Sequence, residues 1–222
     1  TGGSGGRIAV GHDNRPSSPE LAERLCRGLN AAGLDAVLLG TVPTPTLYYA
    51  TVALETDGGI QITGSHNPPE YNGIKMVVDG GSVYGEAIQE LRELVLAEDY
   101  ATGEGTTTRE EVLGRYVKEI GERARVEGPV HVVLDCGNGT GSVVAPEALR
   151  AAGIEVTCLY CESDGTFPNH HPDPTVDENL VDLISLVRET GADLGIGLDG
   201  DADRIGAVDG DGRIVRGDHL LL

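Results

Sequence analysis

The sequence predicts an α/β protein made of two successive α/β domains, each with a mixed, largely parallel sheet covered by helices. Short apolar stretches typical of strands alternate with longer stretches of helical periodicity, in two series along the 222-residue chain. Strands that alternate with helices favour parallel pairing through right-handed crossovers. Between the series, residues 98–108 are acidic, rich in Gly and Thr and without periodicity, as expected of a linker. We therefore expect domains at 7–108 and 109–222, behind a flexible lead-in at residues 1–6.

The first domain is expected to open with a strand at residues 7–11. The next helix starts at Ser17 or Ser18, because Glu20 has the spacing of a capping box, and it ends at Gly33. The same patterns predict the elements that follow: a strand at 36–39, a helix at 45–54, strands at 59–63 and 74–79, and a helix at 84–97.

The second domain is expected to repeat the alternation and to finish with a hairpin. Its elements are a helix at 110–125, a strand at 130–135, a helix at 143–152, a strand at 154–160, a helix at 178–189 and a strand at 194–198. Strands at 205–208 and 213–215 follow, and the Asp-Gly-Asp-Gly turn between them predicts an antiparallel hairpin.

The charge of the chain restricts its partners. The formal net charge is −20, and Lys75 and Lys118 are the only lysines. Such a composition argues against nucleic acid and against anionic membranes, which both attract Lys and Arg. No apolar stretch approaches the roughly 20 residues of a membrane-spanning helix, so a cytoplasmic protein is expected. The oligomeric state does not follow from the sequence.

The cysteines raise the question of a zinc site. Cys158 and Cys161 are close in sequence to His170 and His171. An offset of three along an extended chain, however, directs the two thiols to opposite faces, and no second cysteine pair follows. Ordinary reduced thiols are therefore favoured over zinc ligands.

Two short segments carry the polar side chains that indicate chemistry. Residues 63–68, TGSHNP, place Ser65 on a turn after one predicted strand, and Asp199 follows another. Ligands gather at such strand ends in open α/β sheets. Asp199, Asp201 and Asp203 are three like charges that repel one another, and a hard divalent cation bound to their oxygens would remove this repulsion. A phosphate on Ser65 would complete the coordination shell of the cation. The pattern predicts phosphoryl transfer through a phosphoserine, with Mg²⁺ as the electrostatic partner.

A family resemblance accompanies these segments. Residues 60–75, IQITGSHNPPEYNGIK, closely resemble the phosphoserine signature of the α-D-phosphohexomutases, the phosphomannomutases and phosphoglucomutases. Residues 199–204, DGDADR, resemble the magnesium loop of that family, and residues 11–20 and 165–174 match two further motifs in the same order. The chain is similar to the first two of four family domains from about Arg7 onward, so we expect an N-terminal two-domain fragment of a mutase.

The resemblance implies an isomerase of carbohydrate metabolism that transfers a phosphoryl group between C1 and C6 of mannose or glucose phosphates. It implies that phosphorylated Ser65 donates to the substrate through a hexose bisphosphate, and that Ser65 and the three aspartates coordinate Mg²⁺. It assigns general acid/base work to Lys75, which needs a lowered pKa, and phosphate or substrate contacts to Asn67 and Arg204. The alternative is a fragment that binds metal and phosphate without turnover.

Two arginines and one histidine near these motifs each have a functional and a structural interpretation. Arg15 and Arg204 are bidentate phosphate donors by type, and we include Arg15 among the catalytic residues, yet either could form a structural ion pair. His66 is a second candidate proton carrier, or it contacts phosphate or satisfies local backbone groups.

Overall fold

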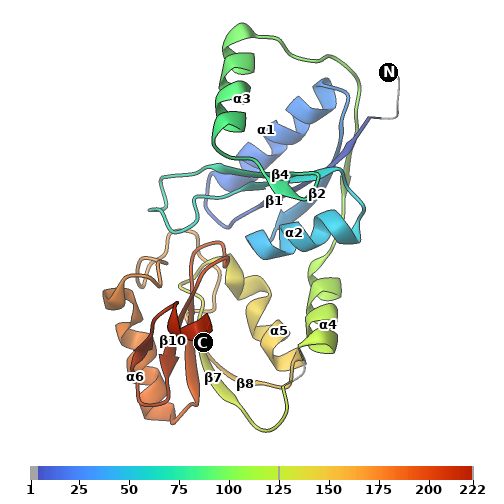
Figure 1. Ribbon diagram of the computed structural model, residues 1–222. Coiled ribbons are helices and arrows are strands. Elements are labelled where there is room, and N and C mark those ends of the chain that lie inside the picture. The colour runs from blue at the N-terminus through green and yellow to red at the C-terminus, as the bar shows by residue number, and fades with distance from the viewer. Residues whose placement is uncertain (1–4, 125, 222) are drawn as a thin grey trace.

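The computed structural model describes residues 5–124 and 126–221 and contains two α/β domains, one above the other in Figure 1. The predicted fold class is confirmed: each domain has one mixed sheet, and the central strand pairs of both sheets are parallel. The described part of the chain holds no helix that is long and apolar enough to cross a membrane.

The sheet of the first domain has six strands in the order β5-β4-β3-β1-β2-β6. The strands are β1 (Arg7–His12), β2 (Asp35–Thr41), β3 (Gly58–Ile62), β4 (Ile74–Val78), β5 (Gly81–Ser82) and β6 (Thr107–Arg109), and the helices are α1 (Ser18–Ala31), α2 (Thr44–Ala53) and α3 (Glu86–Ala97). Successive residues of β1 face opposite sides. Ala9 packs with Leu47 of α2, and Val10 packs with Ala22 of α1. Each face of this sheet therefore has its own core.

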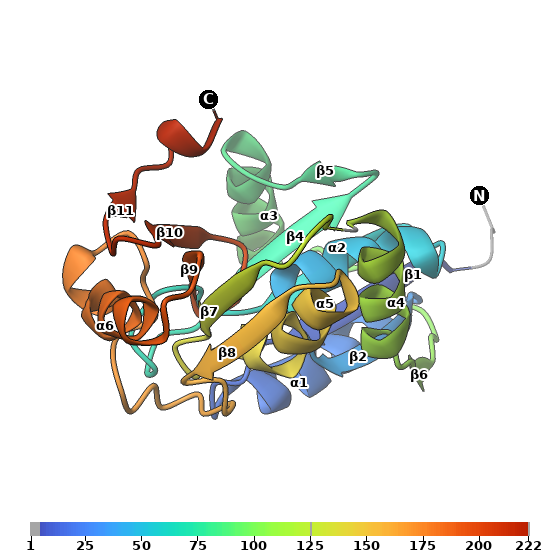
Figure 2. The same ribbon diagram turned by 90° about the horizontal axis from the view of Figure 1, so that it is seen from below.

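The second sheet has five strands in the order β11-β10-β9-β7-β8. The strands are β7 (His131–Asp135), β8 (Glu155–Leu159), β9 (Leu194–Leu198), β10 (Ile205–Asp209) and β11 (Ile214–Val215). The helices are α4 (Leu113–Arg123), α5 (Ala145–Ala151) and α6 (Val181–Thr190), with 3-10 turns η1 (Thr140–Val143), η2 (Asp177–Leu180) and η3 (His219–Leu221). Helix α6 covers one face of the sheet and α5 the other, where α4 lies beside it (Figure 2). The predicted β10–β11 hairpin is confirmed.

The structure corrects two details of the predicted elements. Residues 107–109 form β6, which pairs with β2, so the first sheet extends beyond the predicted boundary at 108. Neither Ser17 nor Ser18 caps α1: Ser17 Oγ accepts a hydrogen bond from Asn72, and the Ser18 hydroxyl donates to Asp13. The flexible lead-in falls largely on residues 1–4, which lie outside the described residues.

Helix α3 lies on the surface, and none of its residues is buried. Its apolar side chains are at the surface, where Leu91 is 38 % exposed and Val95 is 58 % exposed. Figure 1 shows α3 at the end of the first domain farthest from the second. Its position therefore has no bearing on the strand ends where the two domains meet.

Replacing Leu183 of α6 with alanine is expected to destabilise the second domain by about 2–5 kcal/mol. Leu183 is fully buried against Val133 and Val208, so its truncation leaves a cavity in a core that relaxes only partly. Urea denaturation followed by circular dichroism measures the loss. Leu96→Ala on α3 is the matched control, because Leu96 is 63 % exposed. A loss below about 1 kcal/mol for Leu183→Ala would contradict this description of the core.

Candidate active site

The turn after β3 and the loop after β9 meet between the domains. The Ser65 hydroxyl donates a hydrogen bond of 2.9 Å to Asp199 Oδ2, although the two residues are 134 positions apart in sequence. Both are buried. Gly200 permits this approach, because a Cβ there would overlap the backbone oxygen of Ser65. The structure thus brings together the two segments that the sequence analysis singled out.

Ser65 is held in an unusual backbone conformation. Its φ is +50°, in the left-handed region that non-glycine residues rarely adopt and that costs of order 1–3 kcal/mol. Its amide donates to Thr63 Oγ1 at 2.9 Å, and the preceding Gly64 amide donates to Asp13 Oδ2 at 3.1 Å. These bonds fix the turn and direct the serine hydroxyl at the second domain.

The Arg15 side chain holds this turn through hydrogen bonds to its backbone. Its side chain is fully buried, and Nε donates to Asp13 at 2.9 Å. The other guanidinium hydrogens donate to the carbonyl oxygens of four residues of the turn: Ser65, Asn67, Pro68 and Tyr71. Gly64 must lack a side chain here, because a Cβ would lie 2.5 Å from the Arg15 Cζ.

Of the two interpretations of Arg15, these contacts favour the structural ion pair over a catalytic or phosphate-contacting role. A guanidinium has five N–H donors, and all of them are directed at protein oxygens. Arg15 is therefore a positioning residue for the turn that carries Ser65.

The carboxylates of Asp199, Asp201 and Asp203 lie close enough to share one ion, with candidate ligand atoms within 4.8 Å of one another. Asp199 Oδ1 accepts the amides of Asp203 and Arg204, which curls the loop around the carboxylate. Asp201 Oδ1 is buried without a hydrogen-bond partner among the described residues. An unsatisfied buried carboxylate oxygen is costly, and a set of carboxylate oxygens is what Mg²⁺ prefers. The residues present therefore fit a divalent cation.

Lys75 of β4 supplies the nearest cationic charge. Its Nζ lies 2.6 Å from both Asp201 Oδ2 and Asp203 Oδ2. Burial lowers the pKa of Lys75, but the two carboxylates outweigh burial and the pKa is raised. The lowered pKa that the sequence analysis required for acid/base work is thus not found, because carboxylates rather than cations surround the ammonium. In this arrangement Lys75 is a charged partner of the carboxylate loop.

Cation binding at this loop is expected to weaken as the pH falls through 7. Burial, followed by the charges of Asp201 and Asp203, raises the pKa of Asp199 to about 7. Below that value Asp199 holds a proton that competes with a cation, and above it the carboxylate is free to bind. The affinity for Mg²⁺ should therefore drop roughly tenfold between about pH 8 and about pH 6. Calorimetric titration at both pH values measures it, and equal affinities would contradict the expectation.

His66, Arg204 and Asn67 lie at the rim of the site. Arg204 Nη1 lies 2.8 Å from His66 Nδ1. Because a guanidinium only donates, Nδ1 accepts and the proton of His66 is on Nε2. The Arg204 side chain is 47 % exposed and the Asn67 side chain is exposed, so both can reach a bound anion.

Three further residues complete the site and were missed by the sequence analysis. Asp13 accepts from Arg15 and Gly64, and Thr44 at the start of α2 donates to Asp201 Oδ2 at 2.5 Å. Thr140 donates its hydroxyl and its amide to the Gly200 oxygen. Asp13 lies within one of the quoted motifs, whereas Thr44 and Thr140 are isolated threonines without a sequence signal.

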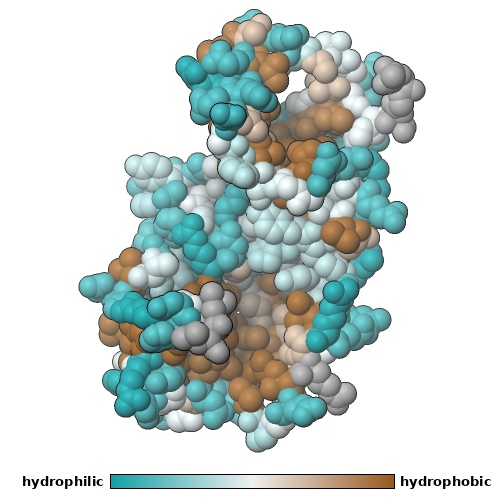
Figure 3. All heavy atoms as spheres, viewed as in Figure 1, coloured by the Kyte–Doolittle hydropathy of each residue, from teal (hydrophilic) through white to brown (hydrophobic). Residues whose placement is uncertain are grey.

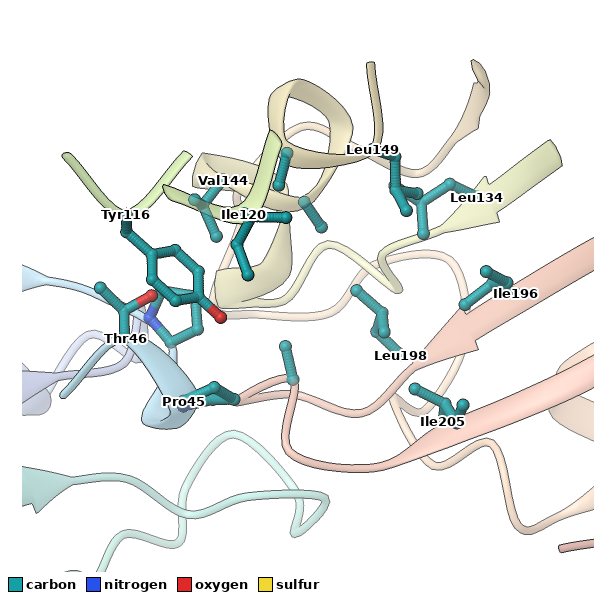
Figure 4. A pocket seen from close by; sticks show the side chains of 14 residues that line it. Pro45, Thr46, Tyr116, Ile120, Leu134, Val144, Leu149, Ile196, Leu198 and Ile205 are labelled. Carbon is teal, nitrogen blue, oxygen red and sulfur yellow. The ribbon is translucent and has the colours of Figure 1, made fainter. Parts of the chain in front are cut away.

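An apolar cavity of about 250 Å³ adjoins the carboxylate loop at Ala202. It lies between the second sheet, α4, α5 and the start of α2, and Figure 3 shows apolar residues lining a hollow on this side. The side chains labelled in Figure 4 are apolar except for Thr46 and Tyr116. Without a charged side chain in its lining, this cavity is unsuited to a phosphate. The chemistry therefore belongs to the loops.

Among the described residues, the group of side chains that could hold a metal ion is the aspartate triad, and it includes none of the cysteines. His170 instead pairs with Asp135 at 2.9 Å, and its ring packs against Tyr160.

Comparisons with known proteins agree with the motifs. Residues 2–102 match the phosphoglucomutase/phosphomannomutase α/β/α domain I, and residues 114–212 match domain II. The chain is 49 % identical over 215 residues to a phosphomannomutase/phosphoglucomutase of Pseudomonas aeruginosa, covering 97 % of this chain and 46 % of that protein. A phosphoglucomutase of Neisseria meningitidis is 44 % identical, with 97 % and 47 % covered.

A solved structure is similar as well. A crystal structure of a phosphoglucomutase/phosphomannomutase family protein from Burkholderia thailandensis superposes with a TM-score of 0.93 at 42 % identity, over 96 % of this chain and 48 % of that one. The chain thus spans about half the length of the curated relatives it matches. With both domain models matched in order, the chain belongs to the phosphoglucomutase/phosphomannomutase family.

Proposed function

We propose that this chain carries the phosphoserine and the metal site of a hexose-phosphate mutase, an isomerase of carbohydrate metabolism. The observation that carries the proposal is the hydrogen bond from the Ser65 hydroxyl to Asp199 inside the carboxylate loop. It supports a phosphorylated Ser65 beside a cation. The names of the curated relatives support mannose and glucose phosphates as the sugar substrates.

The proposed reaction has two transfers at Ser65. In the first, the bond between phosphorus and Ser65 Oγ breaks, a bond from phosphorus to the hydroxyl oxygen at C1 or C6 of the hexose phosphate forms, and the proton of that hydroxyl ends on Ser65 Oγ, which becomes a hydroxyl again. The resulting bisphosphate then returns its other phosphoryl group to Ser65, which leaves the isomeric monophosphate. Transfers of this kind depend mainly on positioning and on charge stabilisation.

The residues of the chain divide this work. Asp199, Asp201 and Asp203, with an oxygen of phosphorylated Ser65, would hold Mg²⁺. When bound, the cation supplies positive charge that stabilises the charge on the transferring phosphoryl group. Lys75 keeps its ammonium charge beside the aspartates, which supports a role in electrostatic stabilisation. Proton transfer then falls to His66. Lys75 takes this role only if its carboxylate partners bind a cation instead.

The substrates are proposed to be hexose phosphates and hexose bisphosphates in the cytoplasm. With a net charge of −20, the chain repels anions over most of its surface. Arg204 and Asn67 at the rim are the proposed phosphate contacts.

A second candidate function is phosphate and metal binding without turnover. The chain covers 46 % of its Pseudomonas relative, and contacts to the remote phosphate and sugar hydroxyls orient the reacting oxygen in phosphoryl transfer. Coupled assays with glucose 1-phosphate and mannose 1-phosphate, run beside the Pseudomonas relative with Mg²⁺ and a hexose bisphosphate, separate the two. We expect little or no turnover by this chain alone. Turnover comparable to the relative would show that these two domains hold a complete active site.

A further inference from the structure

Two of the four cysteines meet behind the carboxylate loop. Cys136 directly follows β7, and Cys161 lies two residues after β8. Their sulfur atoms are 3.3 Å apart. Tyr160, between β8 and Cys161, has a φ of +48°, which ends the regular strand alternation. Cys161 therefore turns toward Cys136.

The two thiols differ in access and in acidity. Cys136 is fully buried, whereas Cys161 is partly exposed. The hydrogen bond with Cys136 lowers the pKa of Cys161 to about 7, although burial opposes the shift. The same bond and burial raise the pKa of Cys136. Since the thiolate is the reactive form, Cys161 is the thiol that reacts first with an oxidant.

From this geometry we propose that Cys161 and Cys136 form an oxidation site. Hydrogen peroxide is the oxidant, and the product is an intramolecular disulfide between the two cysteines. The Cys161 thiolate attacks one peroxide oxygen, the O–O bond breaks, and a sulfenic acid and hydroxide result. The Cys136 sulfur then attacks the sulfenic sulfur, the disulfide forms, and the sulfenic oxygen leaves as water. Altogether two thiols lose two electrons and two protons, and one peroxide is reduced to two waters.

Bond formation would act on the carboxylate loop through direct contacts. A disulfide brings the sulfurs from 3.3 Å to about 2.05 Å. Cys136 packs with Leu198 and Ala202, the residues that flank Asp199 and Asp201. Thr140 in the same connection holds the Gly200 oxygen with hydrogen bonds of 2.7 and 2.9 Å. Oxidation is therefore expected to loosen the loop and to lower its affinity for Mg²⁺ several-fold. This consequence rests on the proposed metal site, whereas the disulfide does not.

The test treats the whole chain with hydrogen peroxide, alkylates the remaining thiols in denaturant and maps the peptides by mass spectrometry. The expected product is a peptide pair joined through Cys136 and Cys161, cleaved by dithiothreitol. Cys158→Ser should retain this pair and Cys161→Ser should lose it. Buried Cys26 on α1 is the internal control and should stay alkylated.

Three results would overturn the site: four alkylated cysteines after peroxide, a disulfide between Cys158 and Cys161, or a bond between two chains. Calorimetric titration of Mg²⁺ into oxidised and re-reduced protein tests the loop separately. Equal affinities with the disulfide in place would overturn the coupling but not the oxidation site. Absence of Mg²⁺ binding in both forms would count against the proposed function instead.

Discussion

Replacing Ser65 with alanine is expected to abolish phosphorylation of the chain by a hexose bisphosphate. The Ser65 hydroxyl faces the aspartate loop and donates a hydrogen bond of 2.9 Å to Asp199. The protein should still fold, because one lost hydrogen bond costs only about 1 kcal/mol and alanine needs no partner in the turn. Mutase turnover by any longer protein that contains this site should disappear with the phosphate.

Intact-mass measurement after incubation with glucose 1,6-bisphosphate and Mg²⁺ checks this expectation. The wild-type chain should gain one phosphate, and Ser65→Ala should gain none. Ser82→Ala is the matched control, because Ser82 is exposed on β5 and should leave the phosphate in place. An added phosphate that survives in Ser65→Ala would remove Ser65 from the mechanism.

Replacing Arg15 with lysine is expected to destabilise the first domain by about 3–5 kcal/mol. Lysine keeps the charge but has three donors on one atom, and it cannot reach the carbonyls of Ser65, Asn67, Pro68 and Tyr71 together. Buried carbonyls would then lack donors, and the left-handed turn at Ser65 would lose its support. Phosphorylation of Ser65 should fall along with stability.

Urea denaturation and hydrogen exchange of residues 64–71 measure these effects. Arg24→Lys is the matched control, because Arg24 pairs with Glu20 on the exposed face of α1 and should change stability by less than about 1 kcal/mol. If Arg15→Lys lost less than about 1 kcal/mol and kept slow exchange in the turn, the positioning role of Arg15 would be wrong.

The elements that carry the site could be predicted because their signals are local. The apolar stretch at 58–62 and the one at 194–198 each end at a polar segment, and strand ends in α/β sheets meet ligands. Ser65 and Asp199 were therefore placed on the correct edges of their sheets.

The remaining features depend on contacts between distant segments. The role of Arg15 is set by carbonyls that lie 50 or more residues away, and the role of Lys75 by aspartates of the other domain. Residue type alone marks both as phosphate or proton partners. Strand β6 has only three residues and pairs at the sheet edge, so its sequence shows no periodicity. The meeting of Cys136 and Cys161 depends on a positive φ at Tyr160, a residue type that rarely adopts one.

The central claim is that Ser65 and the aspartate loop form one site, in which a phosphate on the serine becomes a ligand of the cation. Calorimetric titration of Mg²⁺ into the phosphorylated and the unphosphorylated chain tests it most directly, with Asp201→Asn as the variant that removes one carboxylate charge from the loop. We predict one cation per chain, tighter binding when Ser65 is phosphorylated, and weaker binding in Asp201→Asn in both forms. Equal affinity of the two wild-type forms, or full affinity in Asp201→Asn, would contradict the claim.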